Sequence, residues 1–399
     1  MKKIGNFQTK SSIGTFTILD VVFIVIIFSL LSIAITTFIF KKITKNSNTS
    51  EIDKVYNQII DSYYEEVNQE ELKESAIDGM MKYLGEKYSI YMDKASTDYL
   101  NNELDGKYKG IGVVIAFTNG VATIDNVIKN SPADISGIEV GDIILSYDSI
   151  KITKDTNLND MVEYIKNHNQ VSFSIRRASG DVVINVSTTD IDNPVVSSRL
   201  FSGDDDKKYG YIYLESFSGA SYVQFRNALD ELEKNSLNGL IIDLRTNKGG
   251  YLDQAESIAS MFLSKGKVIY SMKDKHEEIV VYDKTDEKRT YPIVILVNGY
   301  TASSSELLTM ALKESYGAVV VGTNTYGKGK IQQTSSVNDS SMIKYTTATW
   351  YSPNHNCIDG VGIKPSYTAV LDKSYYYNPI DSNDGQLTKA LSILIELFD

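Results

Sequence analysis

The chain of 399 residues is long enough to fold into two or three domains, each with its own hydrophobic core. Its net charge of −11 argues against non-specific binding of nucleic acid, which requires a basic face. Cys357 is the one cysteine, which excludes an intramolecular disulfide, and no cysteine–histidine cluster has the spacing of a structural metal site.

An apolar run lies close to the N-terminus. Residues 21–40 include no charged side chain, and 20 residues span about 30 Å of hydrocarbon as a helix. We expect an uncleaved transmembrane anchor, because the run exceeds the apolar core of a signal peptide and no small-residue cleavage site is evident. A buried core helix is disfavoured by the length of the run so near the terminus. Lysines flank the run on both sides, so the positive-inside rule gives no orientation.

A polar linker over residues 41–50 separates this run from a helical region at 51–105. Two amphipathic patterns follow one another there, the second beginning near Asn68 and ending near Gly85. Two short helices cannot enclose a large core by themselves. We therefore expect this region to pack on another domain or to dimerise.

Short β-like runs separated by Gly, Asn and Asp turns fill residues 107–190. They predict strands over Gly110–Phe117, Val121–Val127 and Ile143–Tyr147, and an amphipathic helix over Leu158–Asn167. This stretch has the size of one compact β-rich domain.

Residues 191–399 alternate between strand and helix patterns, which indicates an α/β layer fold. The predicted strands include Tyr211–Leu214, Leu240–Leu244, Ile293–Val297 and Ala318–Val321. The predicted helices are Tyr222–Asn235, Leu252–Phe262 and Ser304–Ser315.

A turn of small residues connects the strand that ends at Val297 to the helix that follows it. The turn places Ser303 at the head of the helix, where backbone N–H groups and the helix dipole favour a developing oxyanion. Considered alone, Ser303, Ser304 and Ser305 are better explained as helix caps.

A lysine between two glycines, Lys328, follows the next predicted strand, 25 residues after Ser303. That separation leaves room for one helix and one returning strand, which would bring the two residues together. Burial lowers the pKa of a lysine, so that it can serve as the base for a serine hydroxyl. The alternatives are a solvent-exposed turn and a phosphate-binding loop, although the residues before Lys328 do not match the phosphate-loop pattern.

A glycine pair, Gly249 and Gly250, follows another predicted buried strand. Paired glycines let the backbone approach a ligand closely, and an N–H group there could donate to an oxyanion. By itself the pair is also explained as a strand-to-helix turn.

Together these segments resemble the carboxyl-terminal processing peptidases, also called tail-specific proteases, over residues 50–370. The serine turn matches at Gly299–Glu306 and the lysine segment at Tyr326–Gln332. The resemblance implies a crotonase/ClpP-like ββα-layered α/β peptidase core at 191–399. It implies three catalytic residues: the nucleophile Ser303, the general base Lys328, and Gln332, which orients the lysine. It also implies oxyanion donors in the backbone N–H groups of Gly249, Gly250 and Ser304.

The resemblance extends to the other regions of the chain. It implies that residues 107–190 are an inserted PDZ domain whose loop binds the C-terminal carboxylate of a polypeptide substrate. The loop residues are Lys109, Gly110, Ile111, Gly112 and Val113. Residues 51–105 correspond to a segment that supports dimerisation in some members. The family's catalytic domains lie outside the bacterial cytoplasm, so residues 1–20 are expected inside and the peptidase outside the cell membrane, with no cofactor, metal or nucleic acid.

Two other functions remain open at this point. The chain could be a membrane-tethered PDZ scaffold with a silent peptidase core, although Ser303, Lys328 and Gln332 are all present. It could also be a Ser–Lys amidase or acyltransferase, a class that begins from Ser-x-x-Lys on one helix, which Ser303 lacks. His355 stands where the family often has glycine, and we expect an exposed loop histidine rather than a second base.

Overall fold

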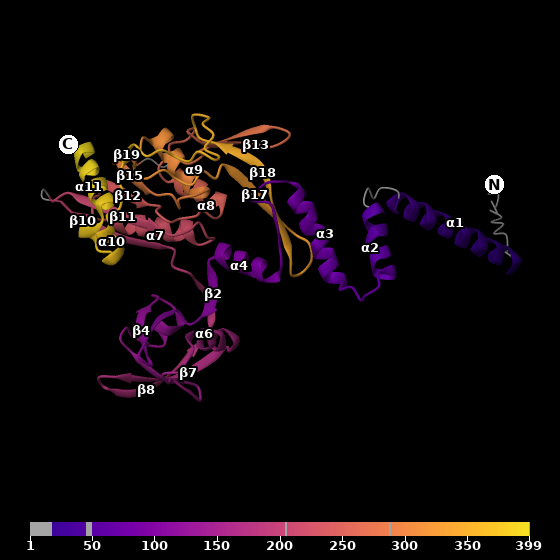
Figure 1. The fold of residues 1–399 in the computed structure, drawn as a ribbon, viewed down its shortest axis with the longest axis horizontal. Coiled ribbons are helices and arrows are strands. Elements are labelled where there is room, and N and C mark those ends of the chain that lie inside the picture. Colours follow the sequence, from indigo (N-terminus) through magenta and orange to yellow (C-terminus); the bar gives the residue numbers. More distant parts are fainter. Residues whose placement is uncertain (1–17, 45–49, 204–205, 287–288, 399) are drawn as a thin grey trace, which may run out of the picture. The chain divides into compact units, whose positions relative to one another are not determined.

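The computed structural model describes residues 18–44, 50–203, 206–286 and 289–398, and the chain divides into two compact units, Met1–Met80 and Met81–Asp399. Three helices begin the described chain: α1 (Ile18–Thr44), α2 (Ser50–Ser62) and α3 (Gln69–Tyr83) (Figure 1). Over the described residues, no helix is both long enough and apolar enough to cross a membrane. The anchor expected at 21–40 falls within α1 and stays a prediction. The position of residues 1–20 inside the cell also stays a prediction, and most of these residues lie outside the described part of the chain.

A β-rich domain occupies the first part of the second unit. Its sheet has the strand order β3-β4-β5-β7-β8, with β6 paired to β5, and a separate ribbon pairs β2 with β9. The predicted strand Val121–Val127 and helix Leu158–Asn167 form with those bounds. The elements are β2 (Lys107–Gly110), β3 (Val113–Thr118), β4 (Val121–Val127), α5 (Pro132–Ile135), β5 (Ile143–Tyr147), β6 (Ile150–Lys151), α6 (Leu158–Asn167), β7 (Gln170–Arg177), β8 (Gly180–Ser187) and β9 (Thr189–Asp192).

A six-stranded sheet organises the rest of the unit, in the order β10-β11-β12-β15-β16-β19. Only β10 runs antiparallel to its neighbour, and the other pairs are parallel. The strands are β10 (Val196–Ser202), β11 (Lys208–Leu214), β12 (Gly239–Asp243), β15 (Ile293–Val297), β16 (Val319–Gly322) and β19 (Tyr367–Thr368).

Alternation along β12 explains how this sheet is covered on both faces. Leu240 and Ile242 join a core cluster with residues of α7, α8 and α9, while Ile241 faces a second cluster built with α11. Helices therefore cover both faces of a mostly parallel sheet, as expected for strands buried on both sides (Figure 1). The helices are α7 (Ser221–Glu233), α8 (Leu252–Ser260), α9 (Ser304–Ala311), the π-helical turn Leu312–Tyr316, α10 (Lys373–Tyr377), the 3₁₀ turn Asp381–Asn383 and α11 (Gly385–Phe398).

A second sheet, β1-β18-β13-β14 with β17 paired to β18, packs through Tyr270 and Trp350 on the cluster around α8 and α9. Its edge strand β1 comes from the region just after α3, far from the others in sequence. This pairing places residues near 90 in the sheet that β17 joins just after Lys328, and Tyr88 contacts both Lys328 and Gln332. The elements here are β1 (Ile90–Met92), α4 (Lys94–Asp105), β13 (Val268–Lys273), β14 (Glu278–Tyr282), β17 (Lys330–Ser336) and β18 (Met342–Tyr351).

Candidate active site

Ser303 stands between β15 and α9 in an unusual backbone conformation. Its φ is 58° and its ψ is −120°, outside the regions that non-glycine residues ordinarily occupy. Such strain costs on the order of 1–3 kcal/mol and persists only where the surroundings enforce it. The turn before it is fixed by Thr301, whose hydroxyl donates to the carbonyl of Leu244 at 2.8 Å. The strained residue lines a cleft of the described chain.

Ser304 and Ser305 do not cap the helix, whereas Ser303 occupies the N-cap position of α9. The Ser304 hydroxyl donates to the carbonyl of Gly250 at 2.9 Å, and the Ser305 hydroxyl donates to the carbonyl of Asn247 at 3.0 Å. Both hydroxyls therefore hold the glycine loop against α9 instead of capping the helix. Ser303 and Ser304 both line the cleft, and the hydroxyl of Ser304 is already engaged with Gly250.

Glu306 connects the serine turn to the lysine segment. Its fully buried carboxylate accepts the backbone N–H of Ser303 at 2.9 Å and that of Lys328 at 2.8 Å on the same oxygen. The other oxygen accepts from the Thr325 hydroxyl and from the backbone N–H of Gly327 at 2.7 Å. A single carboxylate therefore fixes the distance between the two segments. A Ser-x-x-Glu spacing suggests only a capping box, and the contact to Lys328 leaves no local pattern in the sequence.

Glu306→Gln is expected to reduce kcat/KM about 100-fold, because an amide directs N–H groups at backbone donors and shifts both segments. Stability should fall by about 2 kcal/mol, since buried donors lose their acceptor. Kinetics and thermal melts measure the two effects. The matched control is Glu233→Gln, which removes a partly buried carboxylate bonded to Arg289 and Tyr291 far from the cleft. The control should lower Tm and leave kcat/KM unchanged; parent-like kinetics of Glu306→Gln would contradict the role of this carboxylate.

Lys328 lies in the same cleft as Ser303. Burial, together with the charge of Lys344, lowers the pKa of Lys328 to about 8, against the opposing effect of Glu86 and Glu306. Its ammonium nitrogen lies 5.1 Å from the ring centroid of Tyr88. A lysine with this pKa is substantially neutral near pH 8 and can accept a proton.

Gln332 lies four residues beyond Lys328, at a register break of β17. Its amide nitrogen donates to the backbone carbonyl of Tyr88. The side chain thus holds the segment that covers Lys328, and its predicted role of orienting the lysine directly stays a prediction.

The glycine pair packs directly against the serine turn. A Cβ atom on Gly249 would lie 2.9 Å from the Cβ of Ser303, and its φ of +100° favours glycine. The backbone N–H of Gly249 donates to the Asn247 side chain at 2.9 Å, so in this structure it is already hydrogen-bonded. The oxyanion roles of Gly249, Gly250 and Ser304 stay predictions. The structure shows that Gly249 lies close to Ser303.

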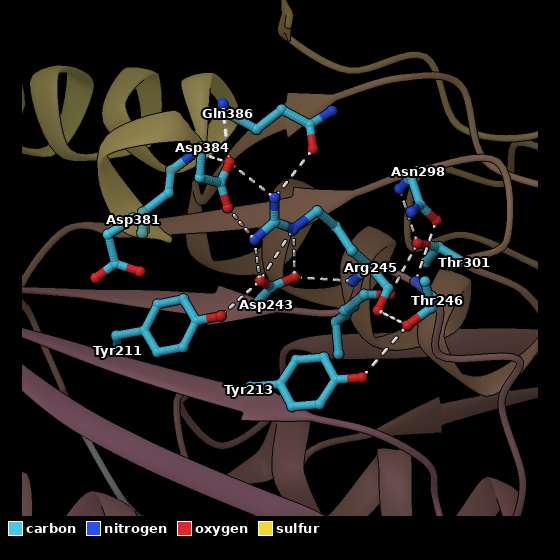
Figure 2. A network of polar contacts seen from close by, with 12 residues as sticks. Tyr211, Tyr213, Asp243, Arg245, Thr246, Asn298, Thr301, Asp381, Asp384 and Gln386 are labelled. Atoms are coloured by element: carbon cyan, nitrogen blue, oxygen red, sulfur yellow. Dashed lines mark hydrogen bonds and ion pairs between the residues drawn. The ribbon is translucent and has the colours of Figure 1, made fainter. Parts of the chain in front are cut away.

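A buried ionic network lies at the end of β12, just before the glycine loop (Figure 2). Arg245 forms ion pairs with Asp243 at 2.6 Å and with Asp384 at 2.8 Å, and its guanidinium also donates to Gln386 at 3.2 Å. The Tyr211 hydroxyl donates to Asp243 at 2.7 Å. The network joins the start of α11 to the strand that leads into residues 246–250. Sequence reasoning did not find it, because Asp384 is separated from Arg245 by 139 residues.

The cleft has a volume of about 1680 Å³, large enough for an extended peptide segment. Apolar side chains and charged groups both line it, as a site for polypeptide backbone and mixed side chains requires. The lining includes Ser303, Lys328, Gly249, Leu307, Ile331 and Trp350.

The proposed carboxylate-binding loop connects β2 to β3, which is the edge strand of its sheet. Gly112 has a φ of +86°, and a Cβ there would lie 2.3 Å from the Cβ of Ser131, so only glycine fits. The carbonyls of Ile111 and Gly112 accept from the N–H groups of Ala133 and Ile128, which fixes the loop. A bound peptide could therefore pair with β3 as an additional strand, because β3 is an edge strand and the loop before it is fixed.

His355 is exposed and lies away from the cleft lining. Its Nε2 contacts the carboxylate of Glu278 at 2.8 Å, and its ring stacks on Tyr351. The expectation of an exposed loop histidine is confirmed.

Comparison with known families matches three regions of the chain. Residues 208–369 match peptidase family S41, residues 123–177 match a PDZ domain, and residues 35–96 match the N-terminal domain of the activating protease CtpB. The chain is 32% identical to the carboxy-terminal processing protease CtpA of Bacillus subtilis, over 94% of this chain and 85% of that protein. The chain belongs to the carboxy-terminal processing proteases of peptidase family S41.

A second relative is the carboxy-terminal processing protease CtpB of Bacillus subtilis, 33% identical over 82% of this chain and 68% of that protein. Among solved structures, the putative S41 protease of Bacteroides fragilis has a TM-score of 0.50 and 18% identity, covering 81% of this chain and 90% of that one. That likeness concerns the fold alone. The predicted family, the α/β core and the PDZ domain are confirmed, and the chain is a serine peptidase; the domain boundaries stay predictions.

Proposed function

We propose that this peptidase cleaves exported or membrane polypeptides with a Ser303–Lys328 dyad after its PDZ domain has bound their C-termini. The observation that carries the dyad is the shared carboxylate: one oxygen of Glu306 holds the backbone N–H groups of both residues. Their side chains line one cleft, in which the pKa of Lys328 is lowered to about 8.

The reaction follows from these positions. The Ser303 hydroxyl attacks the peptide carbonyl carbon while its proton passes to the neutral amine of Lys328. The backbone N–H groups of Gly250 and Ser304 stabilise the oxyanion, and that of Gly249 joins them once it leaves the Asn247 side chain. When the C–N bond breaks, the Lys328 ammonium returns the proton to the leaving amine. Water then hydrolyses the Ser303 ester by the same proton route.

Substrate selection is assigned to the loop Lys109–Val113. Its backbone N–H groups would hold a terminal carboxylate while the substrate extends along the edge strand β3. The cleft volume of about 1680 Å³ supports an unfolded segment as the substrate, because a folded domain would not enter it.

The test is cleavage of one unfolded polypeptide with a free or an amidated C-terminus by the full-length chain. We expect the amidated form to be cut with a KM about tenfold higher, since it lacks the charge that the loop binds. Equal KM values would overturn C-terminal recognition and leave the dyad intact. Tight binding with no turnover would instead establish the silent scaffold, and turnover of cell-wall fragments but not peptides would establish the amidase.

Membrane anchoring by residues 21–40, with the peptidase outside the cytoplasm of a bacterial cell, belongs to the same proposal. Its support is the uncharged run in the sequence. Retention of the chain in the membrane pellet after alkaline extraction, and its digestion by protease added to intact spheroplasts, are the expected results. Release into the alkaline supernatant would contradict the anchor.

Dimerisation through residues 51–105 is the remaining part of the proposal, and it rests on the resemblance of this region to the family's N-terminal segment. Light scattering of the detergent-solubilised chain should give twice the protomer mass of 44.5 kDa. A protomer mass at micromolar concentration would contradict it.

A further inference from the structure

The segment 86–89 lies against Lys328, although more than 200 residues separate them in sequence. This segment falls outside the region that matches the S41 peptidase and inside the region that matches the CtpB N-terminal domain. It contacts Lys328 and residues that precede and follow Lys328 in the chain.

Tyr88 makes the central contact. Its ring centroid lies 5.1 Å from the Lys328 ammonium nitrogen, and its backbone carbonyl accepts the amide of Gln332. Ring and carbonyl thus contact the base and the residue four positions after it. The half-buried ring occupies space that water would otherwise fill.

Lys87 contacts Tyr326, which lies just before Lys328 in the chain. Its ammonium donates to the Tyr326 hydroxyl at 3.0 Å and lies 4.9 Å from the Tyr326 ring centroid. The same ammonium lies 4.8 Å from the ring centroid of Tyr88. Tyr326 precedes Lys328 by two residues, so the segment contacts the chain both before Lys328, at Tyr326, and after it, at Gln332.

The segment is itself fixed to the second sheet. Glu86 accepts the Thr346 hydroxyl at 2.8 Å, and the Ser89 hydroxyl accepts the backbone N–H of Thr346 at 3.0 Å. Thr346 pairs with Gln332 in the β17–β18 ladder. These hydrogen bonds fix the position of the segment beside Lys328.

We propose that residues 86–89 form a wall over the general base, in which Tyr88 is a positioning residue that excludes water from Lys328. The inference rests on the proposed role of Lys328 as base. It extends the catalytic unit beyond the peptidase domain to the region that precedes the PDZ domain.

The groups that face Lys328 decide the sign of the effect. They are Lys344 on β18, Glu86 and Lys87 in the wall, Glu306 on α9, and the ring of Tyr88. The ring face of Tyr88 attracts the ammonium and favours protonation, whereas displaced water disfavours it. Desolvation is the largest cause of the lowered pKa of Lys328, so exclusion of water dominates.

The test compares pH profiles of kcat/KM for Tyr88→Ala, Tyr88→Phe and the parent, in the full-length chain. Tyr88→Ala admits water, and we expect its acidic limb to move up by about half a pH unit, with kcat/KM about threefold lower at pH 7.5. Tyr88→Phe restores the ring, and its limb should lie within about 0.2 unit of the parent's. The matched control is Tyr377→Ala, a tyrosine 89% exposed on α10, which should not move the limb.

A second measurement does not depend on activity. Competitive acetylation of Lys328, read by mass spectrometry across pH in the Ser303→Ala background, gives the pKa of this amine directly. The pKa should rise with Tyr88→Ala and remain low with Tyr88→Phe. Should Tyr88→Ala not fold, Tyr88→Leu replaces it, with a smaller rise because leucine still fills part of the space of the ring.

An unchanged or lowered pKa of Lys328 in Tyr88→Ala, or in Tyr88→Leu where the alanine variant does not fold, overturns the wall. A Tyr88→Phe shift as large as that of Tyr88→Ala also overturns it, because the hydroxyl and not the ring would then be responsible. Full activity of Lys328→Arg would instead overturn the proposed dyad, and the labelling result would still decide whether the wall shields the amine.

Discussion

The Ser303→Ala variant is expected to lose kcat by on the order of 10⁵-fold, with substrate binding retained. Removing the hydroxyl removes the atom that forms the acyl-enzyme, whereas the cleft and the PDZ loop do not depend on it. Single-turnover assays with an unfolded polypeptide measure the loss. Binding of the same substrate, followed by fluorescence anisotropy, should match the parent.

Ser305→Ala provides the matched control, because it removes a hydroxyl two residues away that only contacts the Asn247 carbonyl. It should cost about 1 kcal/mol of stability, as one buried hydrogen bond is lost, with a much smaller effect on kcat. Trapping of a covalent ester on Ser303 in the parent would add direct evidence. Cleavage by Ser303→Ala at the parent's rate would mean that another residue is the nucleophile.

Local patterns in the sequence predicted the framework of the site. The apolar run Ile293–Val297, the small-residue turn and the apolar face of the following helix together specify strand, turn and helix, and β15 forms with the predicted bounds. Parallel neighbours then bring the ends of β12, β15 and β16 to one edge of the sheet. The predicted return of the lysine segment to the serine turn follows from that topology.

Contacts between distant segments could not be predicted in the same way. The pairing of β1 with β18 joins residues near 90 and near 343, and nothing in either strand specifies the other. The wall over Lys328 depends on this pairing, so Tyr88 could not be selected from the sequence. The Asp384–Arg245 ion pair has the same origin, since α11 docks on the sheet through a nonspecific apolar face.

Glu306 has a role that no local pattern in the sequence shows. Its carboxylate accepts the Ser303 N–H, which is the contact of an ordinary capping box. Its full burial distinguishes it from a surface cap, because a buried carboxylate needs several donors. Those additional donors come from Thr325, Gly327 and Lys328, which the fold and not the helix supplies.

The Lys328→Arg variant is expected to lose kcat/KM by roughly 10³-fold or more, because a guanidinium remains protonated and cannot accept the serine proton. The parent should show kcat/KM rising with pH through about pH 8, since the neutral amine is the active form and the pKa of Lys328 is lowered to about 8. Below that pH the ammonium predominates and activity should fall tenfold per unit. Initial rates between pH 6 and 10 measure this limb.

The Lys344→Met variant changes the charge near Lys328 and leaves Lys328 itself intact. Lys344 is the neighbouring charge that most lowers the pKa of Lys328, after burial. Its removal should raise that pKa and move the acidic limb to higher pH, while the plateau at high pH remains within a few-fold of the parent's, because the amine itself is intact. Lys328→Arg, in contrast, should show no recovery at any pH. A limb that stays in place in Lys344→Met, or an arginine variant that recovers at alkaline pH, would show that the proton is taken by a group other than Lys328.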